Sequence, residues 1–164
     1  MRATVAYFTR GGRSEHAAQA LANELGERGV DVELVRLTPT RGTSLVGGAL
    51  LAALRVPSGL THTPDLNGVD LLGLVGPVWA GSVTPAMRSM MDALHDIEGR
   101  PVVSIVCGLH ACTGVAARVV KALHARNAGL VASRAVGRSV LKDPHAIKDL
   151  ARELCAEALQ STRP

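Results

Sequence analysis

The sequence has few aromatic residues and no long hydrophobic run. Tyr7, Phe8 and Trp79 are its complete aromatic set. A protein that stacks the bases of single-stranded nucleic acid needs more aromatic side chains, so we expect no nucleic-acid partner. No apolar stretch approaches about 18 residues, so we expect neither a membrane-spanning helix nor a membrane partner. Because Met1 leads directly into an apolar segment, no signal peptide is expected, and the predicted location is cytoplasmic.

Cysteine is also scarce, and residues for metal binding or hydrolytic catalysis are missing. Cys107, Cys112 and Cys155 are an odd number, which is typical of reduced thiols. The spacing of Cys107 and Cys112 does not match C-x-x-C, and there is no second pair for zinc. The sequence contains no Ser-His-Asp grouping or paired carboxylates. We therefore expect no metal ion and no catalytic side chain of these kinds.

Acidic residues are absent between Glu98 and Asp143, whereas the net charge of the whole chain is +4. A block of one sign attracts anions such as nucleotide phosphates or an acidic partner. The alternative is that these side chains lie on solvated faces and bind nothing specific. The cations of the block are Arg100, Arg118, Lys121, Arg126, Arg134, Arg138 and Lys142.

Strand and helix patterns alternate along all 164 residues, without a linker or an internal repeat. A chain of this length is expected to form one domain, residues 1–164. Segments with helical spacing connect five apolar segments, as in parallel sheets with crossover helices. The sequence therefore predicts an α/β fold: a doubly wound five-stranded parallel sheet, order 2-1-3-4-5, with helices on both faces. The predicted strands cover residues 3–8, 30–37, 69–76, 101–107 and 130–136.

The turn after the first predicted strand has the composition of an anion site. It contains Gly11 and Gly12 and opens a helix, so backbone N–H groups and the helix dipole concentrate positive charge at one point. Arg13 is among the side chains that add donors for phosphate oxygens. The alternative is a tight turn of the kind that any α/β protein needs.

Two further loops follow strand ends and carry unusual residues, at 77–83 and 108–114. Ligands of doubly wound sheets bind at the carboxyl ends of the strands, where the winding direction reverses. In the predicted strand order, both loops meet the first loop, 9–14, at one edge of the sheet. The segment 38–67 interrupts the rhythm with a helical pattern at 44–55. This excursion fits a lid, a dimerisation surface or a loosely packed crossover, and the sequence does not choose among them.

Three segments resemble the flavodoxin family. The opening VAYFTRGGRSEHAAQALANEL resembles its phosphate loop, in which a strand, [S/T]-x-T-G-N-T and a helix follow one another. VDLLGLVGPVWAGSVTPAMRSMMDAL resembles the second family segment, and PVVSIVCGLHACTG resembles the third, whose loop lies beside the flavin ring. The likeness covers nearly the whole chain, and GPVWAG is its most specific part. Gly11 and Arg13 replace the family's Thr and Asn, so side-chain donors are lost and a cation is gained.

The resemblance implies a short-chain flavodoxin-like fold that binds FMN, with the phosphate in the first loop and the isoalloxazine between the other two. Trp79 would pack against the ring, and His110 would donate toward its carbonyl edge. A core tryptophan and a surface histidine are the alternative interpretations. The implied cofactor-binding residues are Thr9, Arg10, Gly11, Gly12, Arg13, Ser14, Pro77, Val78, Trp79, Ala80, Gly81, Gly108, Leu109, His110 and Thr113.

The expected function is that of an FMN redox protein. Electron-carrier flavodoxins are typically acidic, whereas this chain is basic. This favours an FMN-dependent oxidoreductase, NAD(P)H-linked and acting on a small quinone-like acceptor, over a pure carrier for a redox partner protein. A homodimer is compatible with the sequence. The alternative is a non-redox binding or assembly module that keeps the fold but has lost FMN.

Overall fold

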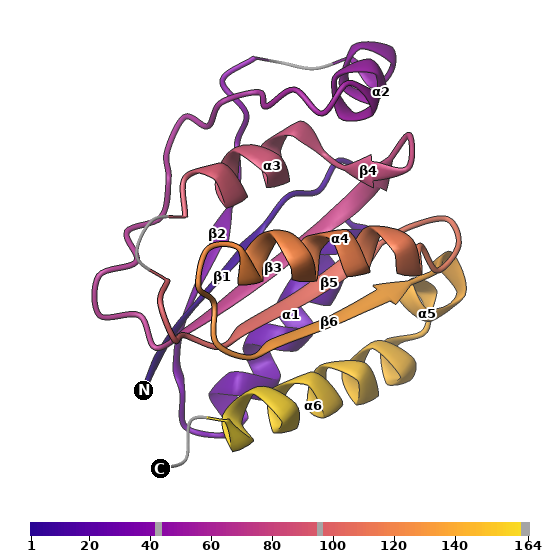
Figure 1. Cartoon of the computed structure of the whole chain (residues 1–164). Coiled ribbons are helices and arrows are strands. Elements are labelled where there is room, and N and C mark those ends of the chain that lie inside the picture. Colours follow the sequence, from indigo (N-terminus) through magenta and orange to yellow (C-terminus); the bar gives the residue numbers. More distant parts are fainter. Residues whose placement is uncertain (42–43, 95–96, 162–164) are drawn as a thin grey trace.

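The computed structural model describes residues 1–41, 44–94 and 97–161. Its centre is a parallel sheet whose strands follow one another in the order β2-β1-β3-β5-β6 (Figure 1). This is the predicted doubly wound order, which is thereby confirmed. The five parallel strands are β1 (Arg2–Tyr7), β2 (Asp31–Arg36), β3 (Leu71–Trp79), β5 (Val102–Cys107) and β6 (Val131–Val136). A sixth short strand, β4 (Ser82–Val83), pairs antiparallel with β3 and was not expected.

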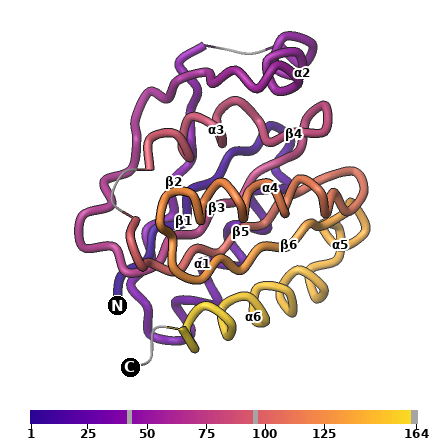
Figure 2. The backbone as a smooth tube through the Cα atoms, in the orientation of Figure 1, coloured from indigo at the N-terminus to yellow at the C-terminus, as the bar shows by residue number. Residues whose placement is uncertain are grey.

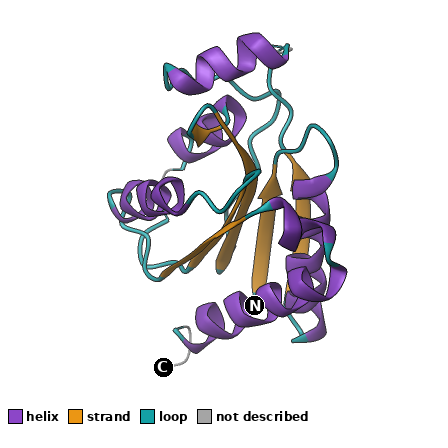
Figure 3. Ribbon diagram, turned by 90° about the vertical axis from the view of Figure 1, so that its right-hand side faces the viewer, coloured by secondary structure: helices purple, strands orange, loops and turns teal. Residues whose placement is uncertain are grey.

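Helices cover both faces of the sheet, as predicted (Figure 3). Successive residues of a strand point to opposite faces, so each buried strand contributes to two cores. Val5 packs in the core under α1 and α6, whereas its neighbour Ala6 packs in the core under α3 and α4. The first face carries α1 (Arg13–Glu27), α5 (Arg138–Lys142) and α6 (Pro144–Gln160), and the second carries α3 (Pro85–Asp92) and α4 (Thr113–His124).

Helix starts agree with the sequence signals in two of the crossovers. Asp143 precedes α6, and its Oδ1 accepts hydrogen bonds from the backbone N–H groups of His145 and Ala146 at 2.9 and 3.3 Å. Pro85 occupies the first turn of α3, and Thr84 lies at the N-cap position but makes no side-chain capping bond. The short helix α5 has no counterpart in the predicted pattern.

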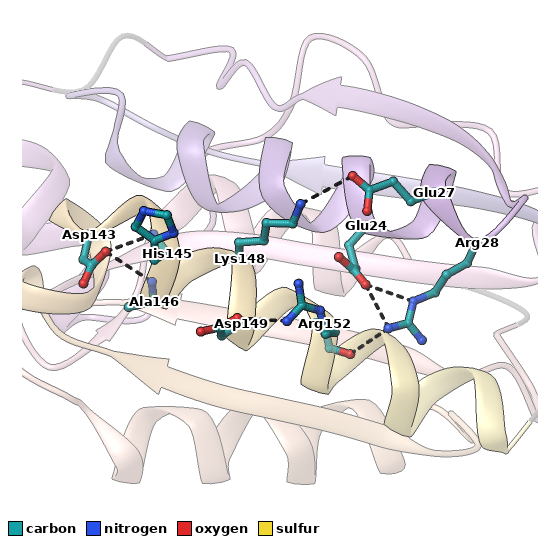
Figure 4. A network of polar contacts seen from close by, with 9 residues as sticks. All are labelled: Glu24, Glu27, Arg28, Asp143, His145, Ala146, Lys148, Asp149 and Arg152. Carbon is teal, nitrogen blue, oxygen red and sulfur yellow. Dashed lines mark hydrogen bonds and ion pairs between the residues drawn. The ribbon is translucent and has the colours of Figure 1, made fainter.

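Polar contacts join α1 to α6 along one side of the molecule (Figure 4). Glu24 of α1 is buried, and its Oε1 accepts from Arg28 Nη2 at 2.8 Å. The same guanidinium donates to the carbonyl oxygen of Arg152 in α6 at 3.3 Å. Lys148 of α6 approaches Glu27 of α1 at 3.6 Å. These contacts hold α6 against α1, the helix that starts directly after the loop following β1.

The excursion between β2 and β3 leaves the sheet and carries α2 (Leu45–Ala53) beyond α3 (Figure 2). Its base is fastened to α3, because Ser89 Oγ accepts from the backbone N–H groups of Ser58 and Gly59 at 3.1 and 3.0 Å. Thr40 Oγ1 donates to the carbonyl oxygen of Ser58 at 2.8 Å. The helix predicted at 44–55 is present as α2. The hydrogen bonds of Ser58 and Gly59 close the base of the segment that carries it.

Candidate functional site

The loop after β1 places backbone donors at the start of α1. Gly12 is the N-cap residue, with φ 80° and ψ −20°, and no side chain caps the helix there. The first N–H groups of a helix have no partner within the helix, and here the cap supplies none. The left-handed φ is easily adopted only by glycine, so Gly12 turns the chain without strain. The result is a helix terminus with free N–H groups, an arrangement that suits an anion.

Side chains of this loop add two cations and two hydroxyl groups. Arg10 and Arg13 are exposed, whereas Thr9 and Ser14 are buried. Ser14 also acts on Cys107 at the end of β5, because its hydroxyl lowers the pKa of that thiol. The loop after β1 and the last residue of β5 therefore lie at the same edge of the sheet, where both line one cavity.

The second predicted loop is a β-hairpin. We expected β3 to end at residue 76, but it continues through Trp79 because Val78 and Trp79 pair with β4. Ala80 and Gly81 connect the two strands with φ values of 47° and 69°, as a two-residue type I′ turn requires. Trp79 is half-buried and meets Phe8 edge-on, with ring centroids 5.7 Å apart. The hairpin therefore fixes the indole beside the phosphate loop.

The third loop begins at Gly108, where no side chain fits. A Cβ there would collide with the carbonyl oxygen of His110. The backbone N–H of Gly108 donates to Val136 at 2.9 Å, and Leu109 accepts from the N–H of Arg138 at 3.1 Å. Leu109 is 67% exposed. The loop thus holds an apolar side chain at the edge of the sheet.

The three loops enclose one cavity of about 510 Å³, which we call the flavin cavity after the ligand that the sequence analysis predicts for these loops. Ten of the predicted residues line it: Thr9, Arg10, Gly11, Arg13, Ser14, Pro77, Val78, Trp79, Gly108 and Leu109. Gly12, Ala80, Gly81, His110 and Thr113 were also predicted but are not among its lining residues. They lie in the same loops or, for Thr113, at the start of α4.

Three lining residues were not among the predicted cofactor-binding residues: Leu45, Cys107 and Leu141. Cys107 could have been found, because it ends a predicted strand at the edge where the loops meet. Nothing in the sequence indicates that Leu45 of α2 or Leu141 of α5 reaches this cavity. Burial raises the pKa of the Cys107 thiol to about 11, although Ser14 and Arg13 act in the opposite direction. Its thiol is therefore neutral at physiological pH.

The basic block of the sequence is dispersed in the fold. Arg134 pairs with Glu153 and Glu157 of α6 at 2.7 and 3.1 Å, and Arg126 pairs with Asp92 of α3 at 2.9 Å. Arg118 lies behind the hairpin, where Nη2 donates to the Gly81 carbonyl oxygen at 2.6 Å. None of these residues lines the flavin cavity, whose cations are Arg10 and Arg13.

A larger cavity of about 840 Å³ lies between α1 and the α5–α6 segment, but its chemistry is mixed. Its lining includes the carboxylates of Glu24 and Glu27 beside Arg138, Lys142 and Lys148. The flavin cavity has no carboxylate in its lining and receives a helix N-terminus, so it is the better match for a phosphorylated ligand. Among the described residues, no His, Cys, Asp or Glu group could hold a metal ion, and no helix is long and apolar enough to cross a membrane.

These observations fit FMN. The uncapped helix terminus and two arginines suit its phosphate, and the adjoining cavity, with Trp79, Val78 and Leu109, suits an apolar ring system. The fold and this edge define a flavodoxin-like nucleotide-binding protein.

Comparison with known proteins gives the family. Residues 5–139 match the NADPH-dependent FMN reductases, and the chain belongs to that family. It is thus an FMN-binding redox protein of the oxidoreductase class, and FMN is its cofactor. This supports the first of the two functions expected from the sequence. No curated protein matches the chain.

Solved structures agree with the fold. A candidate flavoprotein from Bacteroides eggerthii is 17% identical, with a TM-score of 0.68 over 94% of this chain and 98% of that one. Flavodoxin 2 from Bacillus cereus is 17% identical, with a TM-score of 0.61 over 96% and 99%. The flavodoxin of Streptococcus pneumoniae TIGR4 is 15% identical, with a TM-score of 0.59 over 96% and 99%. The flavodoxin-like fold is therefore confirmed.

Proposed function

We propose that this protein is an FMN-dependent oxidoreductase that takes electrons from NADPH and reduces a small quinone-like acceptor. The observation that carries the proposal is the flavin cavity, in which the phosphate loop, the β3–β4 hairpin and the loop after β5 converge. Membership of the NADPH-dependent FMN reductase family supports the choice of reductant. When bound, FMN supplies the redox chemistry, while the chain binds and orients it.

The phosphate end of FMN is held by the start of α1, in this proposal. The N–H groups that follow Gly12 meet phosphate oxygens along the helix axis, where the dipole is favourable. Arg10 and Arg13 add charge-assisted contacts from the exposed side, and the buried hydroxyls of Thr9 and Ser14 face the same cavity. Arg13 takes the place of the neutral donors that flavodoxins carry in this turn.

The ring lies between the hairpin and the loop after β5. Trp79, which meets Phe8 edge-on, and Leu109 both line the cavity and supply apolar surface for the ring. Cys107 at the end of β5 also lines the cavity, and its thiol stays protonated, so it adds no negative charge beside the ring.

Exposed apolar side chains at this cavity support an apolar acceptor. Leu45 and Leu109 both line it, yet they are 60% and 67% exposed. They give an incoming planar ring apolar surface to cover, which is favourable in water. A charged acceptor would gain nothing from these contacts, so a quinone fits better than an ionic oxidant.

The experiment is to saturate the purified protein with FMN, follow flavin absorbance and Trp79 fluorescence, and then mix it with NADPH and a benzoquinone. Trp79 is the only tryptophan, so quenching on FMN addition reports ring binding near the hairpin. We expect a yellow protein, quenched emission and quinone-dependent oxidation of NADPH. A colourless protein that rejects added FMN would instead establish the binding or assembly module.

A further inference from the structure

A third cavity, which we call the hairpin pocket, lies behind the β3–β4 hairpin. Its volume is about 340 Å³. Four of its lining residues are cationic: Arg55 after α2, Arg88 of α3, and Arg118 and Lys121 of α4. None of its lining residues is acidic. Ser82 contributes a hydroxyl, and the rest of the lining is apolar.

The positive charge of this pocket is not neutralised by the protein. In the described part of the chain, none of these four cations forms an ion pair with a carboxylate. Asp92 is the acidic residue whose field reaches Arg88, but its Oδ1 already accepts from Arg126 Nη2 at 2.9 Å. Burial lowers the pKa of the Arg88 guanidinium, and Arg55 lowers it further, while Asp92 raises it. Like charges thus face one another with no counter-charge within the pocket.

Arg88 is held in place yet has an unused donor. Its Nη2 donates to Ser82 Oγ at 3.0 Å, whereas its Nε is buried and has no acceptor. Buried donors in proteins are nearly always paired, so this unpaired N–H is available to an acceptor on a ligand. The Nε–H and one Nη–H of a guanidinium point in parallel, which suits two oxygens of one oxyanion.

We propose that the hairpin pocket binds a phosphate group, with Arg88 as its central donor and Arg55, Arg118 and Lys121 as surrounding charges. The group comes either from free phosphate or from the 2′-phosphate of NADPH. The second source rests on the proposed function. It is geometrically reasonable because the two cavities share one hairpin: Val78 and Trp79 line the flavin cavity, and their pairing partners Ser82 and Val83 line the hairpin pocket. A dinucleotide with its nicotinamide at the flavin would have its other end near this hairpin.

The test begins with calorimetric titration of inorganic phosphate into the FMN-loaded protein, so that the first phosphate site is occupied. Arg88→Met removes the guanidinium but keeps a long unbranched side chain, and Lys121→Met removes an exposed charge. Arg36→Met is the matched control, because Arg36 is exposed and lines neither cavity. We expect Arg88→Met to weaken phosphate binding about tenfold or more, the effect of losing one charge-assisted contact. Lys121→Met should weaken it less, and Arg36→Met not at all.

Steady-state kinetics with NADPH and NADH then distinguish the two sources. If the phosphate belongs to the reductant, Arg88→Met and Lys121→Met raise the KM for NADPH and leave that for NADH unchanged. If free phosphate is the ligand, both variants weaken phosphate binding but keep the NADPH to NADH ratio. Arg88→Lys keeps a charge without the guanidinium, so it should restore only part of the affinity and covers the case that Arg88→Met folds poorly.

The proposal is overturned if neither phosphate affinity nor the NADPH to NADH ratio responds to any of these variants. Binding of an acidic protein alone, with no phosphate binding, would overturn it as well. The titration does not need turnover, so it separates this proposal from the proposed function. If the protein takes up no FMN, the same titration with Arg13→Ala as background still tests the hairpin pocket.

Discussion

The loop after β1 and the hairpin pocket both present positive charge to a cavity, but they are assembled in different ways. In the loop, residues 9–14 are consecutive, and much of the positive potential comes from backbone N–H groups at the start of α1. In the hairpin pocket the positive charge comes from the side chains at positions 55, 88, 118 and 121. These side chains meet only because α3 and α4 lie on one face of the sheet and because α2, which precedes Arg55, packs against α3.

This difference determines how each region should respond to substitution. A site built from backbone donors tolerates the loss of one side chain but not a change of backbone conformation. A site built from side chains is weakened by the loss of one side chain but tolerates a small change of backbone conformation. The predictions below test this contrast, starting with the largest expected effect.

Replacing Gly12 by valine should abolish FMN binding. A β-branched residue at φ 80° is strained by about 1–2 kcal/mol, and the turn that orients the N–H groups must change. FMN affinity, measured by Trp79 quenching, and the melting temperature should both fall. Gly29→Val is the matched control, since Gly29 also has a left-handed φ of 79° and open space for a Cβ but lies at the other end of α1, so it should lose stability and keep its FMN affinity. Unchanged FMN affinity in Gly12→Val would show that backbone conformation does not control the first site.

Raising the pH should lower the free energy of unfolding through Cys107, which lines the flavin cavity. The folded pKa of Cys107 is about 11, above its ordinary value of 9.0, because the buried thiolate is disfavoured. The stabilising contribution is therefore complete below pH 9 and is lost as pH rises toward 11, by on the order of 2 kcal/mol. Urea unfolding at pH 8 and pH 10.5 measures the change, and Cys107→Ala should show a smaller loss. An equal loss in both proteins would assign the pH dependence to Cys155 or Tyr7, whose pKa values burial also raises.

Arg13→Ala should weaken FMN binding by about 1.5 kcal/mol, the lower end of the range for a charge-assisted hydrogen bond. The lower end applies because Arg13 is exposed and its charge is screened by water and salt. The affinity of the wild-type protein should therefore fall more steeply with salt than that of the variant. If titrations in 50 mM and 500 mM NaCl give the same wild-type to variant ratio, Arg13 does not contact the phosphate.

Ala80→Gly should stabilise the hairpin that the two cavities share. Ala80 has φ 47°, which costs a residue with a Cβ roughly 0.5–1 kcal/mol that glycine does not lose. We expect a small rise in melting temperature, with FMN affinity unchanged or slightly lower because the turn becomes more flexible. Ala93→Gly, at a residue with φ −83°, is the control and should destabilise the protein. A lower melting temperature in Ala80→Gly would mean that the turn is not strained.

Much of the fold could be predicted because its signals are local. The apolar runs, the glycine turn before α1 and the Asp143-Pro144 start of α6 each act on neighbouring residues, and each was found where the sequence placed it. The extension of β3 through Trp79 was not found, because it depends on pairing with β4, which has only two residues. A strand that short has no periodicity to recognise.

The sequence by itself determined the strand order, the glycine turn that begins α1 and ten of the thirteen residues that line the flavin cavity. Those residues lie in short segments at strand ends, and the winding of the sheet brings strand ends together. Only the tertiary structure decided that Leu45 and Leu141 reach this cavity and that Arg134 is neutralised by α6. It alone decided that Arg55, Arg88, Arg118 and Lys121 surround one pocket. These outcomes depend on which helix faces meet, and that is set by packing between residues distant in sequence, which no local pattern records.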